Sequence, residues 1–178
     1  MQSAKTMKHP VPEEHLKHIG DIIVSFALLE FQIKSLIGSL IAEHQRVVQI
    51  ITAELSFKNL RALAISLYLE RHGEDNDYSR LKLLMNKAGS LEENDKGISR
   101  NKIIHSVWAA GKDKDHITRI KTTAKQKRGF KFQFEELSAK DLEKFAEKIR
   151  QLAQNIQNFQ IELIENKKAI NNPIKKIW

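Results

Sequence analysis

Apolar side chains recur at intervals of three and four residues along the first part of the chain. Between residues 13 and 43 they mark one helix face, which predicts a long helix; the positions are Ile19, Ile22, Ile23, Phe26, Leu29, Ile33, Leu36, Ile37 and Leu40. Residues 46–54 predict a short helical turn. Ser56 is a favoured N-cap for a helix over 57–72, and Gly73 is a favoured residue just beyond its end.

The same kind of periodicity continues from residue 78 to 110. A heptad row predicts one helix with a single apolar face; the row consists of Leu84, Leu91, Ile98 and His105. Gly89 and Gly97 each weaken a helix interior by about 1 kcal/mol relative to alanine, so this helix could kink at either position.

Between residues 115 and 136 the period changes to two, which predicts a β-hairpin around a polar turn. Ser138 and Asp141 have the spacing of a capping box, and the apolar residues that follow predict a long helix over 138–168. Residues 169–178 form a basic tail. The predicted fold class is all-α: a single domain over 1–178 that forms an up-and-down helical bundle, with helices over 13–110 and a small β-hairpin inserted before the last long helix.

The composition limits both the types of chemical site that the protein can have and its expected location in the cell. The 178 residues contain no cysteine, which excludes disulfides and thiolate sites, and the seven histidines lack the paired spacing of metal ligands, so we expect no metal and no cofactor. No apolar core follows Lys5 and Lys8, as a signal peptide would require. The apolar stretch over 19–42 is interrupted by charges and keeps helical phase, which predicts a core helix. We therefore expect a cytoplasmic protein that does not contact a membrane.

The formal net charge is +8, and the positive excess lies after residue 110. A basic segment favours an anionic partner such as RNA, although a solvated lysine-rich surface has the same charge. The candidate RNA-binding residues lie in the hairpin and are Lys121, Lys125, Lys127, Arg128 and Lys131. Phe130, Phe132 and Phe134 alternate with these cations. Either the rings help to hold a nucleic acid or, as we expect, they cover the bundle.

Candidate chemistry is concentrated between Arg100 and His105, in the last turns of the helix predicted over 78–110. A guanidinium suits phosphate oxygens and an imidazole transfers protons near neutral pH, so the pair suits phosphodiester cleavage without a metal. Asn101 lies four residues before His105, where its amide could orient the imidazole. Arg100 lies about 140° around the helix from His105, so the two converge only through a kink, an extended side chain or a symmetric second subunit.

Glu30 falls on the apolar face of the first helix, between Phe26 and Ile33. A buried carboxylate needs a partner, which Arg100 or Arg61 could supply. Glu30 is therefore a candidate supporting residue for the motif. The alternatives are a structural ion pair, or a helix face that is less buried than its periodicity predicts.

Arg100-Asn101-x3-His105 in a helical bundle resembles the HEPN superfamily, whose members carry an Arg-x4-6-His motif, often with Asn, Asp or His after the arginine. The resemblance covers the bundle pattern from about residue 13 to 168. It implies a metal-independent endoribonuclease, commonly a homodimer with a composite site. It implies that His105 is the general acid or base in 2′-hydroxyl attack, that Arg100 stabilises charge on the phosphate and that Asn101 is a positioning residue. Many relatives are toxins or phage-defence components, often paired with an antitoxin protein.

Two other functions are consistent with the same residues. One is a non-catalytic HEPN-like module that binds a nucleotide or a protein partner. The other is a basic nucleic-acid-binding protein that uses the hairpin and the tail. Substitution of Arg100 and His105 separates the enzyme from both alternatives, because only the enzyme would lose cleavage.

Overall fold

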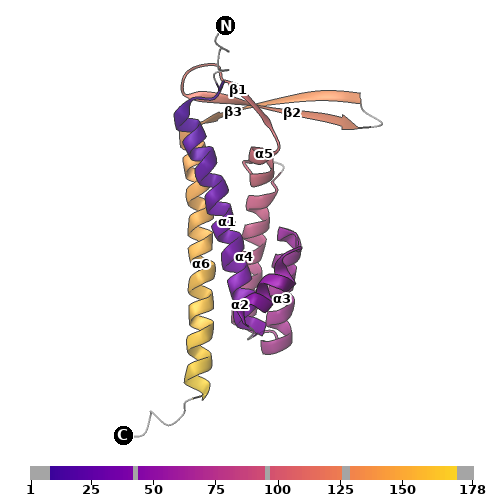
Figure 1. Ribbon diagram of the computed structural model, residues 1–178, viewed down its shortest axis with the longest axis vertical. Helices are drawn as coiled ribbons and strands as arrows, with labels where there is room; N and C mark the ends of the chain where they lie inside the picture. The colour runs from indigo at the N-terminus through magenta and orange to yellow at the C-terminus, as the bar shows by residue number, and fades with distance from the viewer. Residues whose placement is uncertain (1–8, 42–43, 95–96, 126–128, 172–178) are drawn as a thin grey trace, which may run out of the picture.

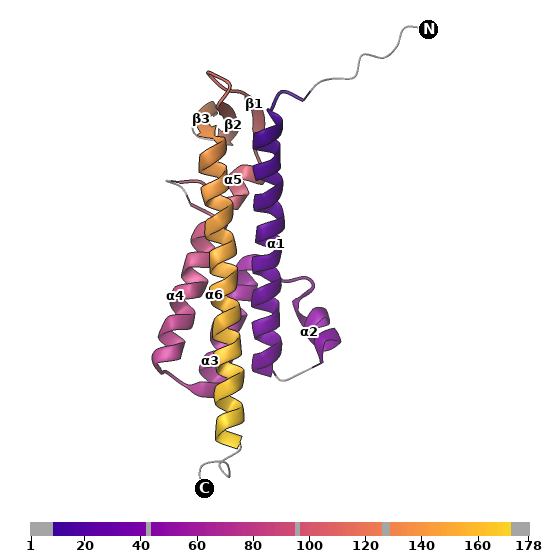
Figure 2. The ribbon, with the colours of Figure 1, turned by 90° about the vertical axis from the view of Figure 1, so that its left-hand side faces the viewer.

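The computed structural model describes residues 9–41, 44–94, 97–125 and 129–171. This part of the chain is mainly helical, with one three-stranded antiparallel sheet (Figures 1 and 2). In chain order the elements are α1 (Glu13–Ile41), α2 (Gln45–Thr52), α3 (Phe57–His72), α4 (Asn76–Glu92), α5 (Arg100–Ile104), β1 (Val107–Ala110), β2 (His116–Lys125), β3 (Gly129–Ser138) and α6 (Ala139–Asn171).

The long helices α1 and α6 lie side by side and form the most extensive packing between helices (Figure 2). Both run from the sheet toward the opposite end of the molecule, because α4 and α5 bring the chain back to the sheet before α6 begins (Figure 1). Their facing sides are fully buried and supply most of the core together with α3 and α4; examples are Ile22, Leu29, Ile33, Ile149 and Ile156. The apolar periodicity that predicted these two helices is confirmed.

Local end signals explain where α3 and α6 begin. Ser56 Oγ accepts a hydrogen bond from the Asn59 N–H at 3.2 Å, and Gly73, at φ 76°, ends α3. At the start of α6 the Ser138 N–H and Oγ donate to the Asp141 carboxylate at 3.1 and 2.6 Å, while Ser138 Oγ accepts from the Asp141 N–H at 3.2 Å. Both predicted caps are therefore confirmed.

The single helix predicted over 78–110 is wrong in its second half. The backbone is already extended at Glu93, α5 is only one turn long, and residues 107–110 form the strand β1. Pairing with β2 satisfies the backbone of β1, and the Trp108 indole N–H donates to the Ile103 carbonyl at 3.1 Å. The heptad row of apolar residues continues past the end of α4, because Ile98 packs against the core from the segment between α4 and α5.

The sheet has the order β1-β2-β3, so the predicted hairpin over 115–136 is confirmed and β1 is an addition to the all-α fold that we expected. Its inner face covers the end of the bundle with the buried Ile117 and Leu137. The expectation that the phenylalanines cover the bundle is wrong for Phe132 and Phe134, which are 56% and 67% exposed. The side chains of Lys125, Phe130 and Lys131, all of Lys127 and Arg128, and tail residues 172–178 lie outside the described part.

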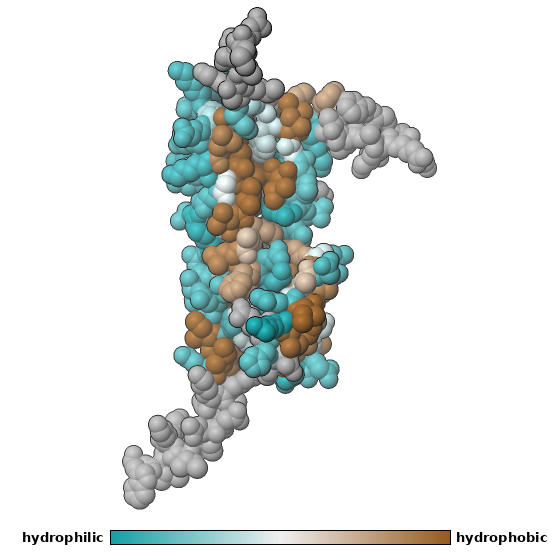
Figure 3. All heavy atoms as spheres, viewed as in Figure 1, coloured by the Kyte–Doolittle hydropathy of each residue, from teal (hydrophilic) through white to brown (hydrophobic). Residues whose placement is uncertain are grey.

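Helix α1 is apolar on two sides. Its inner side is core, as predicted, but its outer side exposes five large apolar residues: Leu16, Ile23, Val24, Leu28 and Phe31. The placement of Ile23 on the buried face is therefore wrong, since Ile23 is 46% exposed. By length and composition α1 could cross a membrane, a property that it shares with core helices of soluble proteins, and 39% of its most apolar window is buried. Figure 3 shows apolar surface along α1. We call these five exposed residues the α1 strip.

Candidate functional site

The one-turn helix α5 carries the Arg-x4-His motif at the junction of the bundle and the sheet (Figure 1). Ile103, which is 2% exposed, anchors it to the core, and its N–H donates to the Ser99 carbonyl at 3.0 Å. His105 follows the last helical residue, and its N–H donates to the Asn101 carbonyl at 3.0 Å. The motif therefore begins on a short helix and ends just beyond it, rather than lying in a long helix.

Arg100 is half-buried and is directed at α1. Its guanidinium carbon lies 5.4 Å from the centre of the Phe26 ring, a cation–π distance. Its Nη1 donates to Asn101 Oδ1 at 3.0 Å. The Asn101 amide oxygen therefore positions Arg100 in this conformation, whereas the sequence had placed it next to the His105 imidazole.

His105 is exposed and lines a small cleft between α5, the segment before it and β2. The cleft has a volume of about 230 Å³ and is lined by Glu93, Asn94, Ser99, Asn101, Lys102, His105, Ser106, Arg119 and Lys121. The lining has three cations, of which Arg119 is paired with Glu135, against the one carboxylate of Glu93, so the cleft suits an anion. Its volume lies below the roughly 300–1,000 Å³ of pockets that enclose drug-sized ligands, which suits a segment of phosphate and sugar.

An unsatisfied hydroxyl adds hydrogen-bonding capacity to this cleft. Ser99 is 1% exposed, and its Oγ has no hydrogen-bond partner in the part of the chain that the structure describes. A buried hydroxyl without a partner costs free energy, typically about 1–3 kcal/mol. A ligand oxygen in the cleft could restore that hydrogen bond.

Arg119 forms a fixed wall of the cleft. It is 4% exposed, and its Nε and Nη2 donate to Glu135 Oε2 at 2.8 and 2.7 Å, while Nη1 donates to Ser106 Oγ at 3.2 Å. Because its charge is already paired, Arg119 holds the sheet against the motif rather than offering a cation to a ligand. The neighbouring exposed cation on the same face of β2 is Lys121.

A second arginine lies behind Arg100. Arg61 approaches Glu92 at 3.7 Å and lies 5.7 Å from the centre of the Phe57 ring, which itself is 4.6 Å from the Phe26 ring. Burial raises the pKa of the Glu92 carboxyl, and the charges of Arg61 and Arg100 partly oppose this shift. Arg100 therefore lies at one end of a stack of two cations and two rings, close to a single carboxylate.

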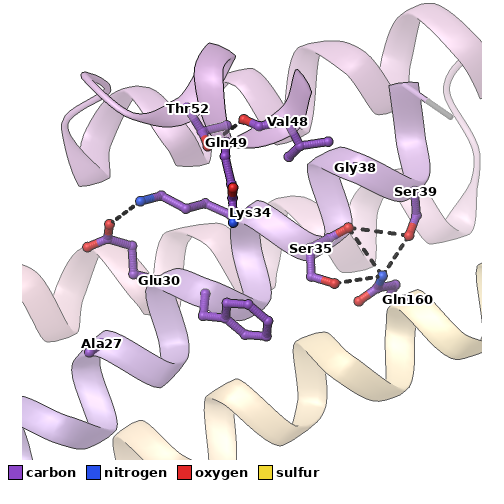
Figure 4. Close-up of a pocket in the computed structure, with 11 residues that line it drawn as sticks. Ala27, Glu30, Lys34, Ser35, Gly38, Ser39, Val48, Gln49, Thr52 and Gln160 are labelled. Atoms are coloured by element: carbon purple, nitrogen blue, oxygen red, sulfur yellow. Dashed lines mark hydrogen bonds and ion pairs between the residues drawn. The ribbon is translucent and has the colours of Figure 1, made fainter. Parts of the chain in front are cut away.

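Glu30 does not pair with Arg100 or Arg61; the structure instead agrees with the stated alternative of a structural ion pair on a partly exposed helix face. It is 36% exposed and pairs with Lys34 at 2.7 Å, in a hollow of about 730 Å³ between α1 and α2 (Figure 4). The Gln160 amide in the same hollow donates to Ser35 and Ser39. This hollow is larger than the His105 cleft. However, Lys34 is already paired with Glu30, and the Gln160 amide nitrogen already donates to Ser35 and Ser39. We therefore place the candidate site at His105.

The structure brings His105, Asn101 and Lys121 to one cleft and directs the Arg100 guanidinium elsewhere. Sequence reasoning missed Ser99, Lys102, Ser106 and Arg119 in the lining. Lys102 is inside the motif and Ser99 and Ser106 flank it, so adjacency was a usable signal for these three. Arg119 could be found only through strand pairing, which places it opposite Trp108.

No family model, no curated protein and no solved structure matches this chain. Among the described residues, no group of three or more His, Asp or Glu side chains could hold a metal ion.

Proposed function

We propose that this protein is a metal-independent endoribonuclease of the HEPN type. The observation that carries the proposal is the exposed imidazole of His105 in a cleft that also presents the exposed Lys121. Lys102 adds positive charge to the lining, although its Nζ already donates to the Gly97 carbonyl at 2.7 Å. An imidazole beside cations can transfer a proton while the phosphate charge is held nearby.

In this reaction His105 takes the proton of a ribose 2′-hydroxyl, or returns a proton to the leaving oxygen. The 2′-oxygen attacks the adjacent phosphorus, the bond to the 5′-oxygen of the next nucleotide breaks, and the products are a 2′,3′-cyclic phosphate and a 5′-hydroxyl. Arg100 stabilises the developing phosphate charge, and Asn101 positions Arg100 through the hydrogen bond described above.

The proposal includes a homodimer, because one chain does not direct Arg100 and His105 at the same point. The α1 strip supplies a surface for the second copy (Figure 3). Val24 and Phe31 are 69% and 53% exposed within it, and exposed apolar strips of this kind mark interaction sites. In a two-fold dimer each cleft can be completed by an arginine from the other chain.

Substitution of the motif tests the activity. We expect His105→Ala and Arg100→Ala each to abolish cleavage of total RNA in EDTA, with cyclic-phosphate ends on the wild-type products only. His44→Ala and Arg46→Ala, at exposed positions on and before α2, are the matched controls and should cut normally. Full cleavage by both motif variants would refute the proposal.

Mixed dimers test the composite site. If each site takes Arg100 from one chain and His105 from the other, a heterodimer of the two inactive variants keeps one intact site of its two. A fully exchanged equal mixture should then recover about one quarter of wild-type cleavage. Val24→Lys should separate the chains and remove this recovery. No recovery in a mixture that contains heterodimers would place the working pair within one chain.

One observation favours a second candidate, a non-catalytic nucleic-acid-binding protein: the Arg100 guanidinium is occupied by Phe26 and Asn101 instead of facing the cleft. Tight RNA binding with no cleavage would select it. If the enzyme is correct, uncontrolled RNA cutting would harm the cell that makes it, which is the situation of a toxin or phage-defence protein held by an antitoxin.

A further inference from the structure

The outer face of the sheet is an exposed apolar surface remote from the core. Strand register places Val107, Ile120 and Phe134 in one row across β1, β2 and β3. Phe132 precedes Phe134 by two residues and therefore lies on the same face of β3. Val107 is 68% exposed, and Phe132 and Phe134 are also more than half exposed. We call Val107, Ile120, Phe132 and Phe134 the outer sheet patch.

Two rings of this patch are arranged as a stack. The centres of Phe132 and Phe134 lie 6.1 Å apart and their planes differ by 20°. Two nearly parallel rings on alternate residues of one strand, both more than half exposed, present aromatic faces and edges to solvent. Flat π-surfaces stack on nucleobases, whatever the sequence of the nucleic acid.

The positive charge of the hairpin favours RNA over a second copy of the chain as the partner of this surface. Residues 112–138, which include the whole hairpin, contain eight Lys and Arg against four Asp and Glu. A second copy docked on this face would bring two such segments together, and their like charges would repel. Single-stranded RNA has both properties that the hairpin matches, a chain of negative charges and unpaired aromatic bases.

We propose that the outer sheet patch is a stacking platform for unpaired bases of single-stranded RNA. Its position supports this ligand over an anionic membrane surface, because the opposite face of the same strand β2 supplies Arg119 and Lys121 to the His105 cleft. β3 is an edge strand, so one RNA chain can pass around it from the patch to the cleft. This inference rests on the proposed function only in naming RNA as the substrate that is cut.

Binding measured in a His105→Ala background tests the platform without interference from cleavage. The probes are a labelled 12-nucleotide oligouridine, a duplex of the same length, and a 12-residue strand whose central nucleotides are abasic, each followed by fluorescence anisotropy in EDTA. We expect the double substitution Phe132→Ala and Phe134→Ala to weaken oligouridine binding by about 10- to 100-fold and to leave its salt dependence unchanged. Lys121→Ala should instead reduce the salt dependence.

Leu83→Ala is the matched control, because Leu83 is a large apolar residue of α4 that is 55% exposed and lies outside both the outer sheet patch and the α1 strip. It should bind oligouridine like the parent, and circular dichroism should show that all variants are folded. Unchanged binding by the double variant would overturn the inference, as would equal binding of the abasic strand or the duplex. So would binding to phosphatidylserine vesicles without binding to RNA. Wild-type protein that binds oligouridine through the patch but cuts no RNA would instead refute the proposed function alone.

Discussion

The two ends of this molecule are built in different ways. The α1–α6 bundle consists of long periodic helices whose facing residues are fully buried, such as Leu29 and Ile149. The sheet end, which carries the motif, combines two ten-residue strands with a five-residue helix and a four-residue strand, and individual polar contacts hold it together, such as that of Trp108 with the Ile103 carbonyl. The bundle therefore supplies stability, and the sheet end holds exposed functional groups that add little to it.

The largest expected effect tests this division. Ile149→Ala removes a fully buried side chain from the centre of α6 and should lower the free energy of unfolding by about 2–5 kcal/mol. Val107→Ala and His105→Ala, at exposed positions of the sheet end, should each change it by less than about 0.5 kcal/mol. Urea unfolding followed by circular dichroism measures all three. A loss at Val107 as large as that at Ile149 would mean that an additional partner or contact covers the sheet end.

An ion pair with one buried partner, Arg119–Glu135, can be compared with a pair whose two partners are both exposed, Arg150–Asp21. Glu135→Gln removes the carboxylate that pairs with the buried Arg119, so we expect a loss of about 2 kcal/mol. Asp21→Asn breaks the pair with Arg150, whose side chains are 36% and 44% exposed, and should cost at most about 1 kcal/mol.

Trp108 pairs with Arg119 across β1 and β2, so its fluorescence can show whether the loss of Glu135 destabilises the sheet more than the helices. In a Trp178→Phe background, its fluorescence reports on the sheet and the ellipticity at 222 nm reports on the helices. Glu135→Gln should move the fluorescence transition to lower urea than the helical transition. Coincident transitions after this substitution would show that the two ends unfold as one unit.

The same division explains how far the sequence predicted the molecule. Period and capping residues located α1, α3 and α6 because Ser56, Gly73 and the Ser138–Asp141 box act on their own neighbours. β1 was not predicted, because its conformation depends on pairing with β2 and not on its own four residues. Glu30 was misplaced because periodicity identifies a helix face but not how far a neighbouring helix covers it.

Gly89 of α4 lies beside the guanidinium of Arg61, the second arginine behind Arg100. Glycine in a helix interior usually costs about 1 kcal/mol relative to alanine, so Gly89→Ala would normally stabilise α4. Here a side chain at position 89 would collide with the guanidinium of Arg61, which donates to the Met85 carbonyl at 3.1 Å and approaches Glu92. We therefore expect Gly89→Ala to give no stabilisation in the wild type.

The same substitution in an Arg61→Ala background should recover the stabilisation of about 1 kcal/mol, because the collision is absent. A double-mutant cycle from urea unfolding measures this difference. If Gly89→Ala stabilises both backgrounds equally, Arg61 does not limit the space beside α4, and the stack behind Arg100 is looser than its contacts indicate.

The smallest expected effect distinguishes two carboxyl groups, those of Glu92 and Asp141, by the sign of their pH dependence. Burial raises the pKa of Glu92, so its contribution to the free energy of unfolding is greatest below the unfolded carboxyl pKa of about 4.3 and is lost as pH rises through the folded value. Hydrogen bonds from Ser138 lower the pKa of Asp141, so its contribution is present above about pH 3.9 and is lost as pH falls through the folded value.

The free energy of unfolding of the wild type minus that of Glu92→Gln should therefore decrease as pH increases from 4 to 7. The same difference for Asp141→Asn should increase between pH 3 and 5. Urea unfolding of the three proteins over this range measures both slopes. If the Glu92 slope has the sign of the Asp141 slope, attraction to Arg61 and Arg100 outweighs the burial of Glu92. Arg100 would then be held by a full ion pair, and drawing it into the His105 cleft would require breaking that pair.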